Sequence, residues 1–184
     1  MKKIIRIILV VVISLLTVIA TSVTIYLWAE SDTIELTAIP TSDVQEQLDV
    51  FVEAGLCWKA YVNEDETAAV IHLSKKQREK WKVWITDSMN RSLEDVNKQE
   101  DLKFYVSEDR KKLTLSANEN MSYKTVAAYV SIFIFDMEIY QVLSGEENWS
   151  IDFVLEDMET KEVLYTADFP EETIKVNDKI WNGK

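Results

Sequence analysis

Residues 126–143, VAAYVSIFIFDMEIYQVL, are apolar around nearly the whole circumference of a helix, and the run is broken mainly by Asp136, Glu138 and Gln141. A helix of this kind is buried, either in the core of a protein or in a membrane. Two carboxylates near its middle would cost several kcal/mol in lipid. We therefore expect a central helix within a globular domain, covered by a sheet on one side and by other helices on the other.

Segments with strand-like alternation lie on both sides of this helix, in pairs that each bracket a polar turn. The pairs are 57–63 with 68–73, 102–107 with 112–117, and 149–156 with 161–167. Their inward-facing candidates are Trp58, Ala60, Val62, Phe104, Val106, Ile151, Phe153 and Leu155. Segments 61–65, 105–109 and 153–157 each place Glu-Asp after an aromatic residue and a valine. This similarity indicates either an internal repeat or the ordinary composition of hairpins.

Two long helices connect these hairpins. Ser74 and Gln77 form a capping-box pattern at the start of the first helix. Its apolar stripe is Trp81, Trp84, Ile85, Ser88, Met89, Leu93 and Val96. The second is the central helix, which we expect to begin after Ser122 and to end near Gly145.

A shorter helix is expected from Ser42, with Gly55 at the position that follows its carboxyl end. One more strand is expected over 173–181. Together these elements predict an α+β fold: an antiparallel sheet built from three β-hairpins, with two long helices packed on it.

Residues 7–27 contain fourteen Ile, Leu or Val residues, and no charged residue follows Arg6 before Glu30. Each of the fourteen favours insertion into a bilayer by about 0.3–0.6 kcal/mol. As a helix, residues 4–28 would be about 37 Å long, enough to cross a hydrocarbon core of about 30 Å. We expect an N-terminal transmembrane helix ahead of the α+β domain.

The charges that flank this helix predict its orientation. Lys2, Lys3 and Arg6 precede it, whereas acidic residues follow it, so the N-terminus is expected in the cytoplasm. The alternative is a cleaved signal peptide with Val-Ile-Ala at 18–20 as its cleavage site. Both interpretations export the remainder of the chain.

The expected organisation has four parts: a cytoplasmic tail (1–6), a transmembrane signal-anchor helix (7–28), a tether (29–41) and an extracytoplasmic α+β domain (42–184). Residues 33–39 alternate well enough to form an edge strand instead of a tether.

The composition narrows the possible functions. The formal charge of −12 becomes more negative for the exported part, and such a surface repels nucleic acid and anionic lipid headgroups. The single cysteine excludes an internal disulfide, and the single histidine excludes a multi-histidine metal site. The lone cysteine and the Lys/Ile-rich start are typical of a Gram-positive bacterial surface protein.

One pair of residues resembles a minimal thiol nucleophile. A tight turn at Asp65-Glu66 would place Lys59 opposite His72, with Cys57 diagonal to His72 on the same face. The alternative is a strand histidine and a small buried thiol, and no third residue is available to orient the pair.

Three further groups of residues were considered as sites. The acidic turns would form one rim able to collect Ca²⁺ if the hairpins pointed the same way: Glu64, Asp65, Glu66, Glu108, Asp109, Glu156, Asp157 and Glu159. On the central helix, Asp136 is expected to be more buried than Glu138, paired with a lysine or capping a backbone group. The tryptophans would line a groove for carbohydrate or peptide, or pack in the core: Trp58, Trp81, Trp84, Trp149 and Trp181.

No catalytic, cofactor-binding or metal-binding residue is assigned, and no cofactor is implied. The sequence predicts a single-pass, membrane-anchored extracytoplasmic domain of the bacterial cell envelope that binds or assembles without catalysis. Its expected partners are the lipid bilayer, through residues 7–28, and an envelope protein. The alternative is an envelope hydrolase or thiol enzyme that uses Cys57 and His72 or buried carboxylates.

Overall fold

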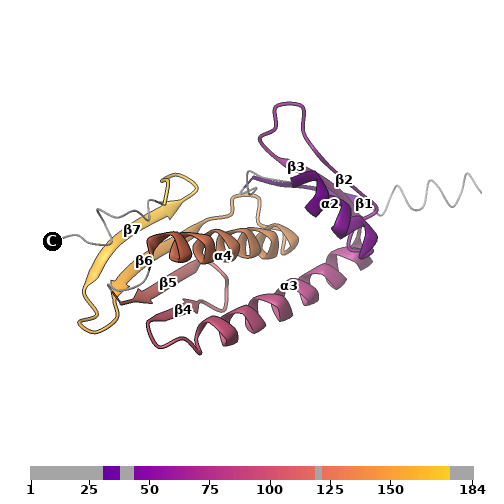
Figure 1. Cartoon of the computed structure of the whole chain (residues 1–184). Helices are drawn as coiled ribbons and strands as arrows, with labels where there is room; N and C mark the ends of the chain where they lie inside the picture. The colour runs from indigo at the N-terminus through magenta and orange to yellow at the C-terminus, as the bar shows by residue number, and fades with distance from the viewer. Residues whose placement is uncertain (1–30, 38–43, 119–121, 175–184) are drawn as a thin grey trace, which may run out of the picture.

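The computed structural model describes residues 31–37, 44–118 and 122–174, which form an α+β fold (Figure 1). This confirms the predicted fold class. The elements, in chain order, are β1 (Ser31–Leu36), α2 (Val44–Glu53), β2 (Lys59–Val62), β3 (Ala69–Ser74), α3 (Lys75–Val96), β4 (Leu102–Val106), β5 (Lys112–Ala117), α4 (Tyr123–Leu143), β6 (Ile151–Asp157) and β7 (Val163–Phe169). The predicted anchor (7–28), Ser42 and most of the strand predicted at 173–181 lie outside the described residues.

The strands form two sheets, whereas we expected a single antiparallel one. Sheet A has the order β1-β3-β2, and sheet B has the order β4-β5-β6-β7. Consecutive strands pair antiparallel in β2–β3, β4–β5 and β6–β7, but β5 and β6 are parallel. Figure 1 shows sheet A at one end of the molecule and sheet B at the other.

The lengths of the two long helices explain this difference. α3 has 22 residues and is therefore about 33 Å long, so it carries the chain too far from β3 for β4 to join sheet A. α4 then returns the chain along sheet B before β6 begins (Figure 1). A helical crossover of this kind is the connection that two neighbouring parallel strands, here β5 and β6, require.

β1 corrects the expected tether. Ser31–Leu36, inside the region 29–41, pairs antiparallel with β3 and forms an edge strand of sheet A. The alternation that favoured an edge strand is visible in the burial of this segment, because Ile34 and Leu36 are buried while Thr33 and Glu35 are exposed. Apolar side chains on one face stabilise the strand by burial against the helices.

α3 begins with the predicted capping box. The Gln77 amide N–H donates to Ser74 Oγ over 3.3 Å, and the Ser74 amide N–H donates to Gln77 Oε1 over 2.9 Å. Four residues of the predicted stripe are buried: Trp81, Ile85, Met89 and Val96. Trp84 departs from the stripe and is 41% exposed.

Trp58 also differs from its expected inward position, since it is 48% exposed. β2 begins at Lys59, so the strand alternation that would bury Trp58 does not extend to it. The preceding residue, Cys57, occupies the buried position and is 2% exposed.

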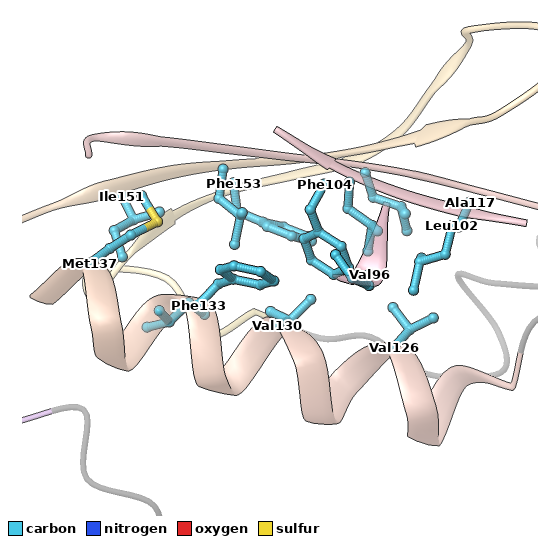
Figure 2. Close-up of a cluster of buried hydrophobic side chains, with 14 of the residues drawn as sticks. Val96, Leu102, Phe104, Ala117, Val126, Val130, Phe133, Met137, Ile151 and Phe153 are labelled. Atoms are coloured by element: carbon cyan, nitrogen blue, oxygen red, sulfur yellow. The ribbon is translucent and has the colours of Figure 1, made fainter. Parts of the chain in front are cut away.

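The described residues contain two hydrophobic clusters, one on each sheet. Figure 2 shows the side chains that α4 directs at sheet B, which are Val126, Val130, Phe133 and Met137. The centroids of the Phe104 and Phe133 rings lie 4.8 Å apart across this contact. The cluster on sheet A receives side chains from both long helices, namely Trp81, Ile85, Ile139 and Leu143. Because α3 and α4 each contribute to both clusters, they join the two sheets into one molecule.

Among the described residues, α4 is the one helix long and apolar enough to cross a membrane, with half of that stretch buried in the protein. It packs on sheet B along one side (Figure 2). Its exposed side carries Lys124, Thr125 and Ser131 together with Ile132. A helix with one buried face and one partly polar face is typical of a globular protein. The expected covering of its other side by helices is therefore incomplete.

Candidate functional site

The pairing of Lys59 with His72 is confirmed, but the proposed contact of Cys57 with His72 is not present. Cys57 belongs to the cluster on sheet A, beneath the strands. His72 alternates with the buried Ile71 and Leu73, so its ring lies on the opposite, outer face. There the Nδ1 atom of His72 lies 2.9 Å from Thr33 Oγ1. Burial raises the pKa of the Cys57 thiol to about 11, which opposes formation of a nucleophilic thiolate.

The outer face of sheet A carries an aromatic group around His72. The ring centroids of Trp58 and Tyr61 lie 5.2 Å and 5.8 Å from that of His72. The ammonium group of Lys59 lies 4.6 Å from the centroid of the Tyr61 ring. These side chains project away from the buried cluster, so they are available to a partner on the outside of the sheet.

The acidic turns do not form the shared rim that we considered. Because β5 and β6 are parallel, the turn that precedes β5 and the turn that follows β6 lie at opposite ends of sheet B. The turn at 64–67 belongs to the other sheet. Within residues 31–37, 44–118 and 122–174, no group of three or more His, Cys, Asp or Glu side chains is arranged to hold a metal ion.

These acidic side chains instead stabilise their own turns. Asp109 Oδ1 accepts the Ser107 hydroxyl over 2.6 Å and the Lys111 amide over 3.2 Å, and these bonds hold the pKa of Asp109 below its usual value. Asp157 Oδ1 accepts the Glu159 and Thr160 amides over 2.9 and 2.7 Å. Side-chain acceptors of this kind are the usual reason for Asp in turns.

On α4, Glu138 rather than Asp136 is the fully buried carboxylate. Its Oε1 atom accepts the amide N–H of Thr37 over 2.5 Å and the Thr37 hydroxyl over 2.9 Å. The backbone-capping role expected for Asp136 therefore belongs to Glu138, which ties α4 to the end of β1. Asp136 is partly buried, and desolvation raises the pKa of its carboxyl to about 7.

Gln141 is a structural residue that sequence reasoning missed. Its Nε2 atom donates to the Arg110 carbonyl over 2.7 Å and to the Ser150 carbonyl over 2.9 Å, while its Oε1 accepts the Ser150 amide over 3.2 Å. The side chain is fully buried. Gln141 thus fastens the β4–β5 turn and the start of β6 to α4. The signal available in the sequence was that Gln141 is an amide residue within a largely apolar run.

A second missed group lies on the outer face of sheet B, where Ser116 and Lys161 both donate to Glu156. The Ser116 hydroxyl bonds Glu156 Oε1, and the Lys161 ammonium lies 3.1 Å from the same oxygen. The bond from Ser116, followed by the influence of Lys161, holds the pKa of Glu156 below its usual value. A serine beside a lysine resembles a nucleophile with its base. Here Lys161 forms an ion pair with Glu156 and the Ser116 hydroxyl already has an acceptor, so the group fastens β5 to β6 and its turn.

The tryptophans do not line one groove. Trp58 lies on the outer face of sheet A, and Trp81 is fully buried beneath it. Trp84 makes an edge contact with Phe51 of α2, whereas Trp149 packs against Phe169 of sheet B. Trp181 lies outside the described residues.

The outer face of sheet B carries an uncharged row across all four strands. Paired positions place Tyr105, Thr114, Val154 and Thr166 side by side, and we call these four residues the central row. The helices pack on the opposite face, and Tyr105 is 59% exposed. A sheet face on which no described helix packs, and which carries an exposed aromatic residue, is a candidate surface for binding a protein. Comparisons with protein-family profiles, curated proteins and solved structures find no match to this chain.

Proposed function

We propose that the chain is a single-pass protein of the bacterial cell envelope, in which residues 7–28 form the transmembrane helix and the acidic α+β domain lies outside the cytoplasm. The domain binds or assembles with a partner and performs no catalysis of its own. The observation that carries the proposal is the long apolar run with basic residues before it and acidic residues after it.

The partner-binding surface in this proposal is the central row on sheet B. The rows on either side of it contain charged side chains, Lys103 and Glu156 in one row and Lys112 and Asp168 in the other. An uncharged centre with a charged rim is the usual composition of a protein–protein interface. We therefore expect the partner to be another protein of the envelope.

Reporter fusions test the location. Alkaline phosphatase fused after residue 184 should be active, since it requires an oxidising compartment, and β-galactosidase fused at the same position should be inactive. The fusion protein should also remain in the membrane fraction after extraction with alkaline carbonate. The opposite pattern of reporter activity, or release by carbonate, would contradict the proposal.

Site-specific crosslinking tests the binding surface. A photoreactive amino acid at Thr166, on the central row, should yield an adduct of higher mass in intact cells, and the additional substitution Tyr105→Glu should abolish it. The same amino acid at Lys124, on the exposed side of α4, is the matched control. Equal adducts at both positions, or none at Thr166, would argue against this surface.

A further inference from the structure

β1 begins very close to the end of the proposed anchor. Only three residue steps separate Trp28 from Ser31, and three steps of extended chain cover at most about 11 Å. If residues 7–28 span the bilayer, as the proposed function requires, the start of β1 is held within this distance of the membrane surface. The end of sheet A at which Ser31 lies is therefore the end nearest the lipid.

The pairing of the strands shows which side chains share that end. Ser31 lies opposite Ser74, and Lys75 and Lys76 follow directly as the first residues of α3. Thr33 lies opposite His72, which in turn lies opposite Lys59. The amide of Trp58 donates to the His72 carbonyl over 3.0 Å. The acidic β2–β3 turn is at the other end of the sheet, because the strands run from Lys59 toward it.

These positions carry basic and aromatic side chains, although the chain as a whole has a charge of −12. Lys59, Lys75 and Lys76 are exposed, and none makes an ion pair with another described residue. Of the neighbouring acidic groups, Asp32 is paired with Arg78 at 3.6 Å, while Glu35 and Glu79 are exposed. These exposed lysines therefore have no anionic partner within the part of the chain that the structure describes.

The stability of α3 does not account for two of these lysines. The amino end of a helix carries a partial positive charge and favours acidic residues, yet the first turn of α3 contains none. Lys75 and Lys76 therefore occupy a position that the helix itself disfavours. Trp, Tyr and Lys are the residues that proteins place at the membrane–water interface.

We propose that this region, which we call the anchor-proximal surface (Trp58, Lys59, Lys75 and Lys76), docks on anionic phospholipid headgroups of the membrane that holds the anchor. The lysines supply attraction to the lipid phosphates, and Trp58, 48% exposed, enters the interfacial layer. This docking is a second contact with the membrane in addition to the anchor. It fixes the domain against the bilayer and leaves sheet B, at the other end of the molecule, directed away from it (Figure 1).

The test measures the distance of the full chain from the lipid after reconstitution into vesicles. A fluorophore on Glu79→Cys, an exposed residue of α3, reports on quenching by a quencher attached to lipid headgroups. The same label on Glu159→Cys, in the β6–β7 turn, reports on the far end of the molecule. Both carry Cys57→Ala, so that one thiol is labelled. Vesicles contain either phosphatidylglycerol with phosphatidylcholine or phosphatidylcholine alone.

Quenching at position 79 should be stronger in the phosphatidylglycerol vesicles and should decline as salt is added, because salt screens surface charge. Lys75→Gln with Lys76→Gln should reduce it to the value in neutral vesicles. The matched pair Lys98→Gln with Lys124→Gln, both exposed elsewhere, should leave it unchanged. The label at position 159 should remain unquenched throughout.

Equal quenching at position 79 in both vesicle types, unaffected by Lys75→Gln with Lys76→Gln, would overturn the docking. Energy transfer between labels on separate chains, lost on dilution in lipid, would assign the surface to a second copy instead. Extraction of the vesicles with carbonate separates this inference from the proposed function. Retention without charge-dependent quenching contradicts the docking alone, whereas release of the chain contradicts the anchor and the docking with it.

Discussion

Glu138 joins two parts of the chain that are 101 residues apart in sequence, since its carboxylate accepts both the amide and the hydroxyl of Thr37. A buried carboxylate is stabilised by such bonds, and its loss removes both hydrogen bonds to Thr37. The Glu138 side chain therefore ties the end of β1 to α4, in addition to the apolar packing of Leu36 in the cluster on sheet A.

Glu138→Ala should lower the free energy of unfolding by about 2–4 kcal/mol, through the lost hydrogen bonds and the cavity that remains. Glu147→Ala, at an exposed position after α4, is the control and should change stability by less than about 0.5 kcal/mol. Urea denaturation of the detergent-solubilised chain measures both. Equal stability of the two variants would contradict the role of Glu138.

Asp136 makes the stability depend on pH. Its carboxyl titrates at about 7 in the folded chain and near 3.9 when unfolded. Between these values the folded state retains a proton that the unfolded state has released, so stability should fall as the pH rises from about 4 to about 7 and level off above. Asp136→Asn should remove this fall and stabilise the chain at pH 8 by about 2–4 kcal/mol. Urea denaturation at pH 5 and pH 8 measures the free energy of unfolding of the parent chain and of Asp136→Asn. An equal decrease in both proteins between the two pH values would contradict this prediction.

At the scale of elements, Gln141 fixes where β6 starts. Its three hydrogen bonds hold the Arg110 carbonyl and both backbone groups of Ser150 against α4. The neighbouring Asp152 amide donates to the Lys111 carbonyl over 2.8 Å, so the β4–β5 turn and β6 are positioned together. An amide side chain in the core thus sets the register of the parallel pair.

Gln141→Leu keeps the volume but leaves these backbone groups without partners. It should cost about 2–4 kcal/mol and accelerate hydrogen exchange of the Asp152 amide more than that of Leu115 in the middle of β5. Gln45→Leu, on the surface of α2, is the control. Uniform acceleration across sheet B would show that Gln141 acts only through global stability.

Elements that depend on local signals were predictable from the sequence. The capping box of Ser74 and the pairing of Lys59 with His72 follow from neighbouring residues and turn length, and both are confirmed. The division into two sheets depends on how far α3 carries the chain, which no local pattern encodes. For the same reason, the spacing of Asp136 and Glu138 showed that they point to different sides but not which side meets β1.

In the molecule as a whole, both hydrophobic clusters contain side chains from the same two helices, α3 and α4. Because α3 and α4 contribute buried side chains to both clusters, neither sheet can lose its covering without affecting the other. The molecule should therefore unfold in a single transition.

Phe153→Ala, in the cluster on sheet B, should destabilise the chain by about 3–5 kcal/mol. It should accelerate hydrogen exchange equally at Leu115 in sheet B and at Ile71 in sheet A. The exposed Val163→Ala is the control for substitution within sheet B. Acceleration confined to sheet B would mean that the two clusters unfold separately.

In the proposed function, the acidic domain stands outside the cytoplasm on an anchor that stays in the membrane. Cysteine accessibility in intact cells tests it most directly, because the native Cys57 is 2% exposed and gives little background. A membrane-impermeant maleimide should label Glu159→Cys in intact cells, and Lys3→Cys only after the membrane is permeabilised. Labelling of Lys3→Cys in intact cells, with Glu159→Cys protected until permeabilisation, would contradict the account.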